Sequence, residues 1–545
     1  MQRLTVYRER NVPVPPAAGA AGAAHLAFPA GADLPERRFA FQGIRHGTEE
    51  TTLTTATGQR TFDSLDPATG AVVGTHPIQD AAAVRAAVAE AGIAAAWWAG
   101  LDRAERRRRL LDYKAVLTRD LTRIARLVHE ETGKPEADAT LEVVLAITHL
   151  DWAARNAHKV LGMRRVSPGL VGANLAATLE YLPLGVVGVI GPWNYPVFTP
   201  MGSIAYALAA GNAVVFKPSE LTPGVGVLLA TLFTEAVPER QVFQTITGLG
   251  ETGAALAGDP GVAKIAFTGS TATAKRVMAA CATNLTPLVA ECGGKDALIV
   301  DADADLPAAA DAALWGALSN AGQTCVGVER IYVVDAVYDA FMKELTDRAG
   351  QVRAGRDYGP ITMPAQLDII RRHIDDAVAG GRAVLGGTDS VRAPFVDPVI
   401  VEDVPEDSSA VREETFGPTV TVKRVADVEE ALEKTNATAY GLAGTVFSGN
   451  TRRALELARR MRGGMTAINS IISFASIPAL PFGGVGDSGF GRIHGADGLR
   501  EFARPKAVSR QRFALPGMNL TSFTRGQKEL DRLVRLVTFL HGRRR

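Results

Sequence analysis

Cysteine is scarce in this chain of 545 residues, and the three that occur are Cys281, Cys292 and Cys325. An odd, sparse set without Cys-x-x-Cys spacing is not a disulfide framework, which favours a reducing, cytoplasmic setting. The nine histidines are scattered and show no metal-ligand spacing, so no metal site is predicted.

An excess of one charge and long apolar runs are missing too. The chain has 59 Lys and Arg against 58 Asp and Glu, which gives no electrostatic reason to expect a nucleic-acid partner. No apolar run reaches the length of a membrane span, and the basic N-terminus lacks the apolar core of a secretory signal. We therefore expect a cytoplasmic protein.

Aromatic residues make up only 6% of the chain, whereas glycine, with 55 residues, is abundant. This balance suits an α/β protein built from tight turns and close-packed layers. The length exceeds what one hydrophobic core supports, so at least two domains are expected.

Apolar segments alternate with helical patterns between residues 185 and 300. Such alternation predicts a parallel, doubly wound sheet, in which ligands bind beyond the carboxyl ends of the strands. Strands are expected at 185–190, 213–216, 242–247, 264–267 and 286–291, and helices at 80–98, 103–131, 135–158, 200–209 and 224–236.

Polar residues follow these strands. The side-chain amide of Asn194, after the first strand, can donate a hydrogen bond to a substrate oxygen. Lys217 and Glu220 follow the second strand, where an acid typically accepts hydrogen bonds from an adenosine ribose. Because its carboxylate would repel a 2′-phosphate, Glu220 favours NAD over NADP. Gly269 and Ser270 form a turn that opens a helix, where backbone N–H groups can face a phosphate.

Two further residues have more specific surroundings. Glu291 ends a strand, and Cys325 follows 34 residues later (325 − 291) in the run Asn320–Cys325. An isolated cysteine is usually a small buried hydrophobe, which suits Cys281 and Cys292. It suits Cys325 less well, because the neighbours of Cys325 are small and polar. The match to G-x-G-x-x-G at 248–253 follows the third strand and is interpreted as a turn.

Seven motifs occur in order: PWN at 192–194, KPSE at 217–220, FTGS at 267–270, ECGGK at 291–295, GQTC at 322–325, EETFGP at 413–418 and PFGG at 481–484. With them the chain resembles the aldehyde dehydrogenase superfamily from about Phe62 to Arg510. The resemblance implies a cofactor domain, a catalytic domain and a small β-oligomerisation element that links subunits into homodimers or homotetramers.

Domain boundaries follow from the motifs and the composition. We predict an Ala/Pro-rich extension (1–60), an NAD-binding domain (61–165 and 185–292), an oligomerisation element (166–184 and 505–515), a catalytic domain (293–482) and a basic helical tail (516–545).

The resemblance also implies a mechanism. Cys325 would be the nucleophile that attacks the aldehyde, with a depressed pKa because only the thiolate is competent. Asn194 and the backbone N–H of Cys325 would form the oxyanion hole, and Glu291 would activate the water that hydrolyses the thioester. The residues expected to bind NAD are Trp193, Lys217, Glu220, Gly269, Ser270, Glu414 and Phe416.

The substrate is less sharply defined by the sequence. Loops around 195–206, 319–330 and 470–480 carry the apolar side chains Phe198, Tyr206, Ile471, Ile472 and Phe474. They favour an apolar or aromatic aldehyde, whereas Arg330 is a candidate for holding a semialdehyde carboxylate. The pair His494-Gly495 resembles the branch that acts on fatty, aromatic or semialdehyde substrates.

Two other functions remain open. In a CoA-acylating dehydrogenase, CoA rather than water would resolve the thioester, and Glu291 speaks against this. A non-catalytic structural protein on the same fold would not need Cys325, Glu291 and Asn194 together.

The tail has a helical pattern of apolar residues with basic residues between them. Leu530, Leu533, Val534, Val537 and Leu540 recur at helical spacing, and Arg532, Arg535 and Arg543–Arg545 add positive charge. Docking on its own or a neighbouring subunit is favoured over a peripheral membrane contact.

Overall fold

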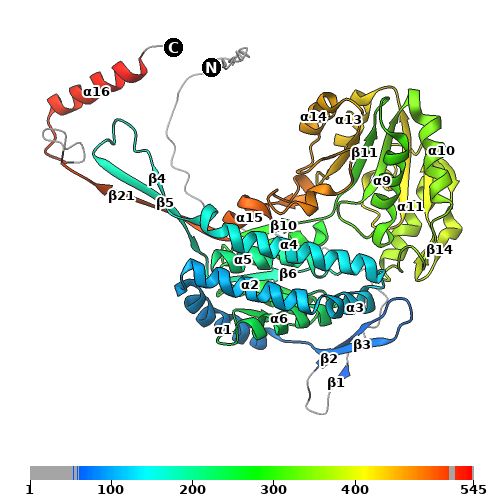
Figure 1. The fold of residues 1–545 in the computed structure, drawn as a ribbon, viewed down its shortest axis with the longest axis horizontal. Helices are drawn as coiled ribbons and strands as arrows, with labels where there is room; N and C mark the ends of the chain where they lie inside the picture. The colour runs from blue at the N-terminus through cyan, green and yellow to red at the C-terminus, as the bar shows by residue number, and fades with distance from the viewer. Residues whose placement is uncertain (1–52, 55–57, 59, 515–521, 543–545) are drawn as a thin grey trace, which may run out of the picture. The chain divides into compact units, whose positions relative to one another are not determined.

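The computed structural model describes residues 53–54, 58, 60–514 and 522–542. Two large sheets, mostly of parallel strands with helices on their faces, confirm the expected α/β class (Figure 1). Most of the segment predicted as an N-terminal extension lies outside the described residues, as do 515–521 and 543–545.

The first sheet is doubly wound. Its strands are β6 (Val186–Ile190), β7 (Ala213–Lys217), β8 (Phe243–Thr245), β9 (Lys264–Thr268), β10 (Leu288–Glu291) and β20 (Gly489–Phe490). They lie in the order β20-β10-β9-β6-β7-β8, and all pairs are parallel except β10 with β20. The chain leaves β6 toward β7 on one side and later returns to β9 on the other. Such a switch point leaves a crevice at the carboxyl ends of the strands.

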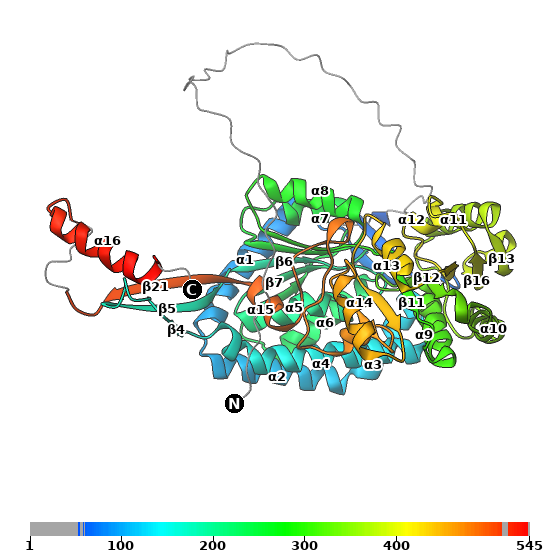
Figure 2. The ribbon, with the colours of Figure 1, turned by 90° about the horizontal axis from the view of Figure 1, so that it is seen from above.

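Helices cover both faces of this sheet. They are α1 (Ala81–Gly100), α2 (Arg103–Arg119), α3 (Leu121–Thr132), α4 (Glu136–Leu161), α5 (Phe198–Ala210), α6 (Pro223–Ala236), α7 (Gly250–Ala257), α8 (Thr271–Ala282) and α15 (Gly495–Glu501). Figure 2 shows α7 and α8 on one face, and α5 and α6 on the other with α2, α3 and α4 behind them. The single helix expected at 103–131 is two helices that meet at Asp120, whose carboxylate is held by Arg119.

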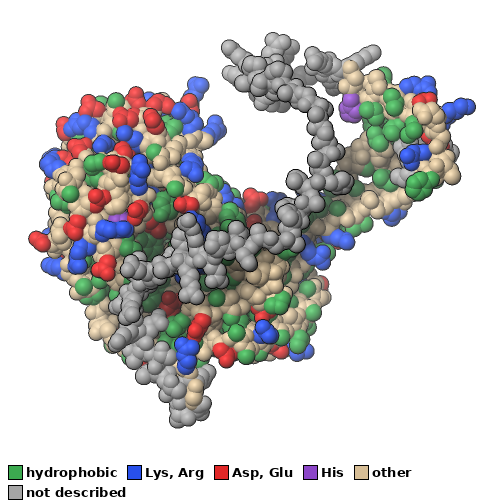
Figure 3. All heavy atoms as spheres, turned by 180° about the vertical axis from the view of Figure 1, so that it is seen from behind, with side chains coloured by type: hydrophobic (Ala, Val, Ile, Leu, Met, Phe, Trp, Pro, Cys, Tyr) green, Lys and Arg blue, Asp and Glu red, His purple; other side chains and the backbone are tan. Residues whose placement is uncertain are grey.

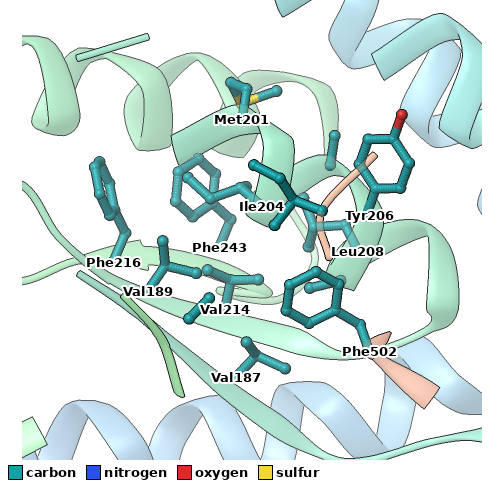
Figure 4. Close-up of a cluster of buried hydrophobic side chains, with 14 of the residues drawn as sticks. Val187, Val189, Met201, Ile204, Tyr206, Leu208, Val214, Phe216, Phe243 and Phe502 are labelled. Carbon is teal, nitrogen blue, oxygen red and sulfur yellow. The ribbon is translucent and has the colours of Figure 1, made fainter. Parts of the chain in front are cut away.

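Helix α5 is buried on all sides, because the sheet covers one face and α4 the other. Figure 4 shows Met201 and Ile204 of α5 above Val187 of β6 and Val214 and Phe216 of β7. Every one of these side chains is at most 1% exposed. Burying such a side chain contributes about 1.5–3 kcal/mol, so the loop at the start of α5 is held by a rigid core.

The second sheet is built from the chain between residues 296 and 468. Its strands are β11 (Asp296–Val300), β12 (Val328–Val334), β13 (Arg382–Leu385), β16 (Val399–Glu402), β17 (Thr419–Val425), β18 (Gly444–Phe447) and β19 (Ala467–Ile468). Their order is β13-β16-β17-β12-β11-β18-β19, with β13 antiparallel. The accompanying elements are α9 (Leu306–Leu318), α10 (Tyr338–Ala349), α11 (Gln366–Gly380), α12 (Ser409–Arg412), α13 (Val428–Asn436), α14 (Thr451–Arg460) and the hairpin β14 (Val391–Arg392) and β15 (Phe395–Val396).

A three-stranded antiparallel arm leaves the first sheet (Figure 1). It consists of β4 (Arg164–Val166), β5 (Leu175–Pro183) and β21 (Ala503–Gln511), in the order β21-β5-β4. Beyond Ala503, every side chain of β21 is exposed. This arm coincides with the segments expected to join subunits, and that role stays a prediction.

Smaller elements lie at the ends of the described chain. The strands β1 (Leu53–Thr54), β2 (Arg60–Leu65) and β3 (Val72–Pro77) form an antiparallel sheet. Residues 53–54, within the segment predicted as an Ala/Pro-rich extension, thus form a strand. The tail contains α16 (Gln527–His541), which has no buried residue. Among the described helices, none is both long and apolar enough to cross a membrane.

Candidate active site

The residues singled out from the sequence line one edge of the first sheet. Glu291 ends β10, and Gly269 and Ser270 follow β9. Asn194 follows β6, Lys217 ends β7, and Glu220 follows it. These four strands are neighbours in the order β10-β9-β6-β7. Their carboxyl ends therefore form one continuous row, which is where a doubly wound sheet binds its ligand.

Cys325 and Glu291 line the same cavity, although Glu291 ends a strand of the first sheet and Cys325 lies in the loop before β12 of the second sheet. The cavity has an empty volume of about 970 Å³, including its open mouth. Its apolar lining includes Leu141, Leu145, Phe198, Trp315, Ile472 and Phe482. Leu141 and Trp315 are also exposed to solvent, so apolar side chains reach the outer surface. The site thus joins a thiol and a carboxyl group to an apolar binding space.

The loop that carries Cys325 is fixed by unusual backbone geometry. Asn320 and Ala321 adopt left-handed backbone conformations, with φ of 52° and 57°, which residues other than glycine rarely adopt. The side chain of Gln323 ties the loop down, because its Nε2 donates to the Asn320 and Pro360 carbonyls and its Oε1 accepts from the Thr362 N–H. Backbone strain of this kind occurs at sites that position a reactive group.

Asn194 is fixed against this loop. Its Nδ2 donates to the Gln323 carbonyl over 2.9 Å, two residues before Cys325. The backbone carbonyl of Asn194 accepts hydrogen bonds from Lys134 Nζ at 2.6 Å and Asn320 Nδ2 at 3.1 Å. The amide nitrogen carries two hydrogens, and the bond to Gln323 uses one, which leaves the other for a ligand oxygen.

A buried ion pair supports this segment and was missed in the sequence analysis. Lys134 Nζ lies 2.7 Å from Glu142 Oε2, and both side chains are 0% exposed. Glu142 Oε1 also accepts hydrogen bonds from the N–H groups of Val197 and Phe198. The pair therefore fixes both ends of the segment 194–198. Lys134 lies between two helices in a Gly-Lys-Pro turn, a pattern that gives no reason to expect a buried lysine.

The Glu291 carboxyl group is buried, and within the described part of the chain neither of its oxygens has a hydrogen-bond partner. Burial raises its pKa well above the usual range, against the opposing charge of Arg492. Gly483 gives it room, since a Cβ at that position would lie 2.6 Å from Glu291 Oε1. The carbonyl of Glu291 accepts a hydrogen bond from the Gly269 N–H, which joins the ends of β9 and β10.

The expected depression of the Cys325 pKa is wrong for the free protein. Burial raises the pKa of this thiol, and the nearby carboxyl groups of Glu414, Asp296 and Glu291 raise it further. The Val326 N–H opposes the shift only in part. The sulfur is thus a protonated thiol at neutral pH.

Glu414 and Phe416 lie next to the ECGGK segment. The Gly294 N–H donates to Glu414 Oε1 over 3.0 Å, and a Cβ at Gly293 would collide with the same carboxyl group. Burial raises the pKa of Glu414 to about 8. The ring of Phe416 packs edge-on against Trp193, with centroids 5.6 Å apart.

A second buried ion pair, Lys295 with Glu329, holds the same loop. Glu329 accepts hydrogen bonds from the backbone N–H groups of Thr415 and Phe416, and Lys295 also reaches the Thr415 hydroxyl. The last residue of the ECGGK motif therefore positions Glu414 and Phe416 indirectly.

The remaining expected cofactor residues lie at the ends of β7 and β9. Lys217 Nζ is 3.7 Å from Glu220 Oε2, and the Glu220 side chain is 44% exposed. The Ser270 hydroxyl caps α8 by accepting the Thr273 N–H. An exposed acid beside an ammonium group suits ribose hydroxyls, and the N-terminus of a twelve-residue helix suits a pyrophosphate. The donors and acceptors present therefore fit a dinucleotide.

Some expected substrate contacts are absent from the cavity lining. Arg330 is buried and donates to the carbonyls of Lys295, Lys434 and Thr435, so it is not free to hold a substrate carboxylate. Of the five apolar residues expected there, Phe198 and Ile472 line the cavity, whereas Tyr206, Ile471 and Phe474 do not.

Known proteins match most of the chain. Residues 54–508 match the model described as the aldehyde dehydrogenase family. The chain is 37% identical over 462 residues to the 4,4'-diapolycopene aldehyde oxidase of Methylomonas sp, covering 84% of this chain and 87% of the relative. It is 36% identical over 499 residues (89% and 95%) to a Mycobacterium ulcerans (strain Agy99) protein named as a candidate succinate-semialdehyde dehydrogenase using NADP(+). The solved NAD-dependent aldehyde dehydrogenase of Sinorhizobium meliloti aligns with a TM-score of 0.80 at 33% identity, covering 85% of this chain and 93% of that one.

Proposed function

The chain belongs to the aldehyde dehydrogenase family, and from this premise we propose that it oxidises an apolar aldehyde to the carboxylic acid with NAD. One observation carries the proposal: a partly buried thiol, Cys325, and a buried carboxyl group, Glu291, line a single apolar cavity. The thiol can hold the substrate covalently, and the carboxyl group can move protons to and from it.

The first step forms a bond between the Cys325 sulfur and the aldehyde carbon, and the thiol proton passes to Glu291. The second hydrogen of Asn194 Nδ2 and the Cys325 N–H stabilise the resulting oxyanion, and one such donor is worth roughly 3–4 kcal/mol of barrier. NAD, when bound, supplies the acceptor for the hydride that leaves this carbon.

The second half of the reaction releases the acid. Oxidation leaves a thioester on Cys325. Glu291 releases to solvent the proton that it took from the thiol, and it then removes a proton from the water that attacks the thioester carbonyl carbon. The carbon–sulfur bond then breaks, and the sulfur regains a proton. A carboxyl group with a raised pKa suits this work, because its base strength approaches that needed near neutral pH.

The lining favours an apolar substrate over a semialdehyde. Lys134 is the one Lys or Arg among the described residues that line the cavity, and it is already paired with Glu142. A substrate carboxylate would therefore find no free cation there. The two relatives reported above carry names from both substrate classes, so the lining of this cavity is the main basis for the choice.

An aldehyde panel tests the proposal. Decanal and benzaldehyde should support NADH formation without CoA, with kcat/KM at least about tenfold above that for succinic semialdehyde. A strict requirement for CoA would overturn hydrolysis and support the CoA-acylating alternative. Preference for succinic semialdehyde would overturn the substrate class alone.

Glu220→Ala should weaken the preference for NAD over NADP. The exposed Glu220 carboxylate would accept hydrogen bonds from the ribose hydroxyls of NAD and repel the 2′-phosphate of NADP. Its removal should reduce the NAD/NADP ratio of kcat/KM by about tenfold or more. Glu251→Ala, which removes an exposed carboxylate paired with Arg60, is the matched control. Equal use of both cofactors by the wild type would contradict this role of Glu220.

The sequence favoured docking of the tail on its own or a neighbouring subunit, but no residue of α16 is buried against its own chain. We therefore propose the alternative, a peripheral contact with an anionic membrane. Val534, Val537 and Phe539 are exposed on α16, and Arg532 and Arg535 add positive charge. Figure 3 shows hydrophobic side chains beside Lys and Arg on the surface of this tail. Truncation before Phe523 should abolish co-sedimentation with phosphatidylserine vesicles and leave kcat unchanged. If vesicle binding survives, or if the oligomeric mass changes instead, the membrane contact is wrong and docking on a neighbouring subunit is favoured.

We further propose that the arm joins subunits into homodimers or homotetramers. The edge strand β21 pairs only with β5 among the described strands, and its side chains are exposed. An exposed edge of this kind is a template for pairing with another chain.

A further inference from the structure

A second cavity lies between α2 and α4, at the base of β5. It has an empty volume of about 1120 Å³ including its open mouth, and it shares no lining residue with the catalytic cavity. Three arginines of α2 line it: Arg103, Arg106 and Arg107. His158 of α4 and Tyr181 of β5 add two more polar side chains to the lining.

Arg106 is a buried cation without a carboxylate partner. It is only 9% exposed, and its Nη1 donates to the Trp98 carbonyl over 2.8 Å. Across the described chain no acid lies within ion-pair distance of it, and its Nε and Nη2 make no hydrogen bond to protein. Burial and the neighbouring Arg103 lower its pKa, and the charge of Asp102 opposes them. A buried charge in this condition is costly unless a ligand pairs with it.

The other arginines of the same run fall into two groups. Arg108 and Arg109 face away from the cavity and form ion pairs with Glu105. Arg103 and Arg107 line the cavity, are exposed, and have no ion-pair partner in the part of the chain that the structure describes. Three positive charges therefore gather on one side of α2, and Asp102 is the one acid among the described residues that line the cavity.

Apart from these polar residues and Asp102, the lining of the cavity is apolar. Its walls include Leu101, Leu110, Leu161, Pro183, Ala209 and Ala210. A ligand that fits it would have an apolar body and an anionic head. Guanidinium groups match carboxylate and phosphate oxygens through paired hydrogen bonds.

We propose that this cavity binds a small amphipathic anion, with its carboxylate or phosphate head on Arg103, Arg106 and Arg107. The apolar body lies against the walls formed by α4, α5 and the base of β5. The site is separate from the catalytic cavity and does not depend on the proposed reaction.

Isothermal titration calorimetry with three probes tests the site. Decanoate and decyl phosphate supply the two head groups, and decanol supplies the same chain without charge. Wild type should bind one or both anions at least about tenfold more tightly than decanol. Arg103→Ala/Arg107→Ala should lose about tenfold or more of the anion affinity, with kcat and KM for aldehyde unchanged. The preferred head group identifies the source as a carboxylate or a phosphate.

The matched control is Arg108→Ala/Arg119→Ala, which removes two charges from the same helix at positions that pair elsewhere. It should bind as wild type does. Decanoate could also enter the catalytic cavity, and such binding would persist in Arg103→Ala/Arg107→Ala. Equal anion binding by all three proteins, or equal binding of decanol, would overturn the proposal. If wild type binds no anion and Arg103→Glu/Arg107→Glu changes the oligomeric mass, the cavity is instead part of a subunit interface.

Discussion

Glu291→Gln is expected to release about one NADH per active site and then to stall. The amide cannot remove a proton from water, so hydrolysis of the Cys325 thioester should fall by roughly 10²–10⁴-fold. Oxidation of the first substrate molecule should still occur, although more slowly, because the Cys325 thiol can lose its proton to water in the cavity instead of to Glu291. Rapid-mix NADH fluorescence and intact-protein mass spectrometry measure the burst and the acyl group on Cys325.

Two results would contradict this role. If Glu291→Gln turned over at the wild-type rate, another group would activate the water. If it gave neither turnover nor a burst, Glu291 would be required before the thioester forms. Glu414→Gln is the informative control, since Glu414 is also a carboxyl group with a raised pKa near Cys325. It should lower cofactor use without accumulating an acyl-enzyme.

Cys325→Ala should lower kcat/KM by at least about 10⁴-fold, because removal of a covalent nucleophile removes the whole pathway. Cys292 is a second cysteine that lines the cavity, and the variant Cys292→Ala should keep most of the activity. Aldehyde turnover and apolar ligand binding are measured together, so that a folded, inactive protein is recognised. Full aldehyde turnover by Cys325→Ala would overturn the role of Cys325 as nucleophile, whereas an absence of turnover in the wild type as well would support a non-catalytic role for the chain.

The pH dependence of the thiol gives an independent check. Because burial and three carboxyl groups raise the pKa of Cys325, the free protein holds it protonated at neutral pH. Its alkylation by iodoacetamide should therefore be slow at pH 7 and accelerate as pH rises beyond 9. A rate that is already at its plateau at pH 7 would mean that the thiolate is stabilised in a way that the free structure lacks.

Much of the first sheet could be predicted from sequence because its apolar strands alternate with helices. The expected strand at 264–267 is observed as Lys264–Thr268, and that at 213–216 as Ala213–Lys217. The ends of the strands were less accurate. The strand expected at 286–291 begins only at Leu288, after Pro287, which has no N–H to donate to a ladder. The break at Asp120 was missed because the apolar spacing continues through both helices.

The site was only partly predictable. Polar residues that directly follow buried strands, such as Asn194 and Glu220, stand out in the sequence. Lys134 does not, because its reason for burial is Glu142 on the next helix and the carbonyl of Asn194. The predicted depression of the Cys325 pKa was wrong for a similar reason. The carboxyl groups that raise this pKa come from segments up to 89 residues away (414 − 325).

Gly483 has no reactive group, yet the position of the Glu291 carboxyl depends on it. The methyl group of an alanine at 483 would occupy the space of the Glu291 carboxyl oxygen, and the alanine would also have to adopt a φ of 147°. An inherited or engineered change at 483 could then imitate the loss of the base itself while every side chain of the reaction remained intact. Substitutions that fill the space beside the Glu291 carboxyl group should therefore be tolerated as poorly as substitutions of Glu291 itself.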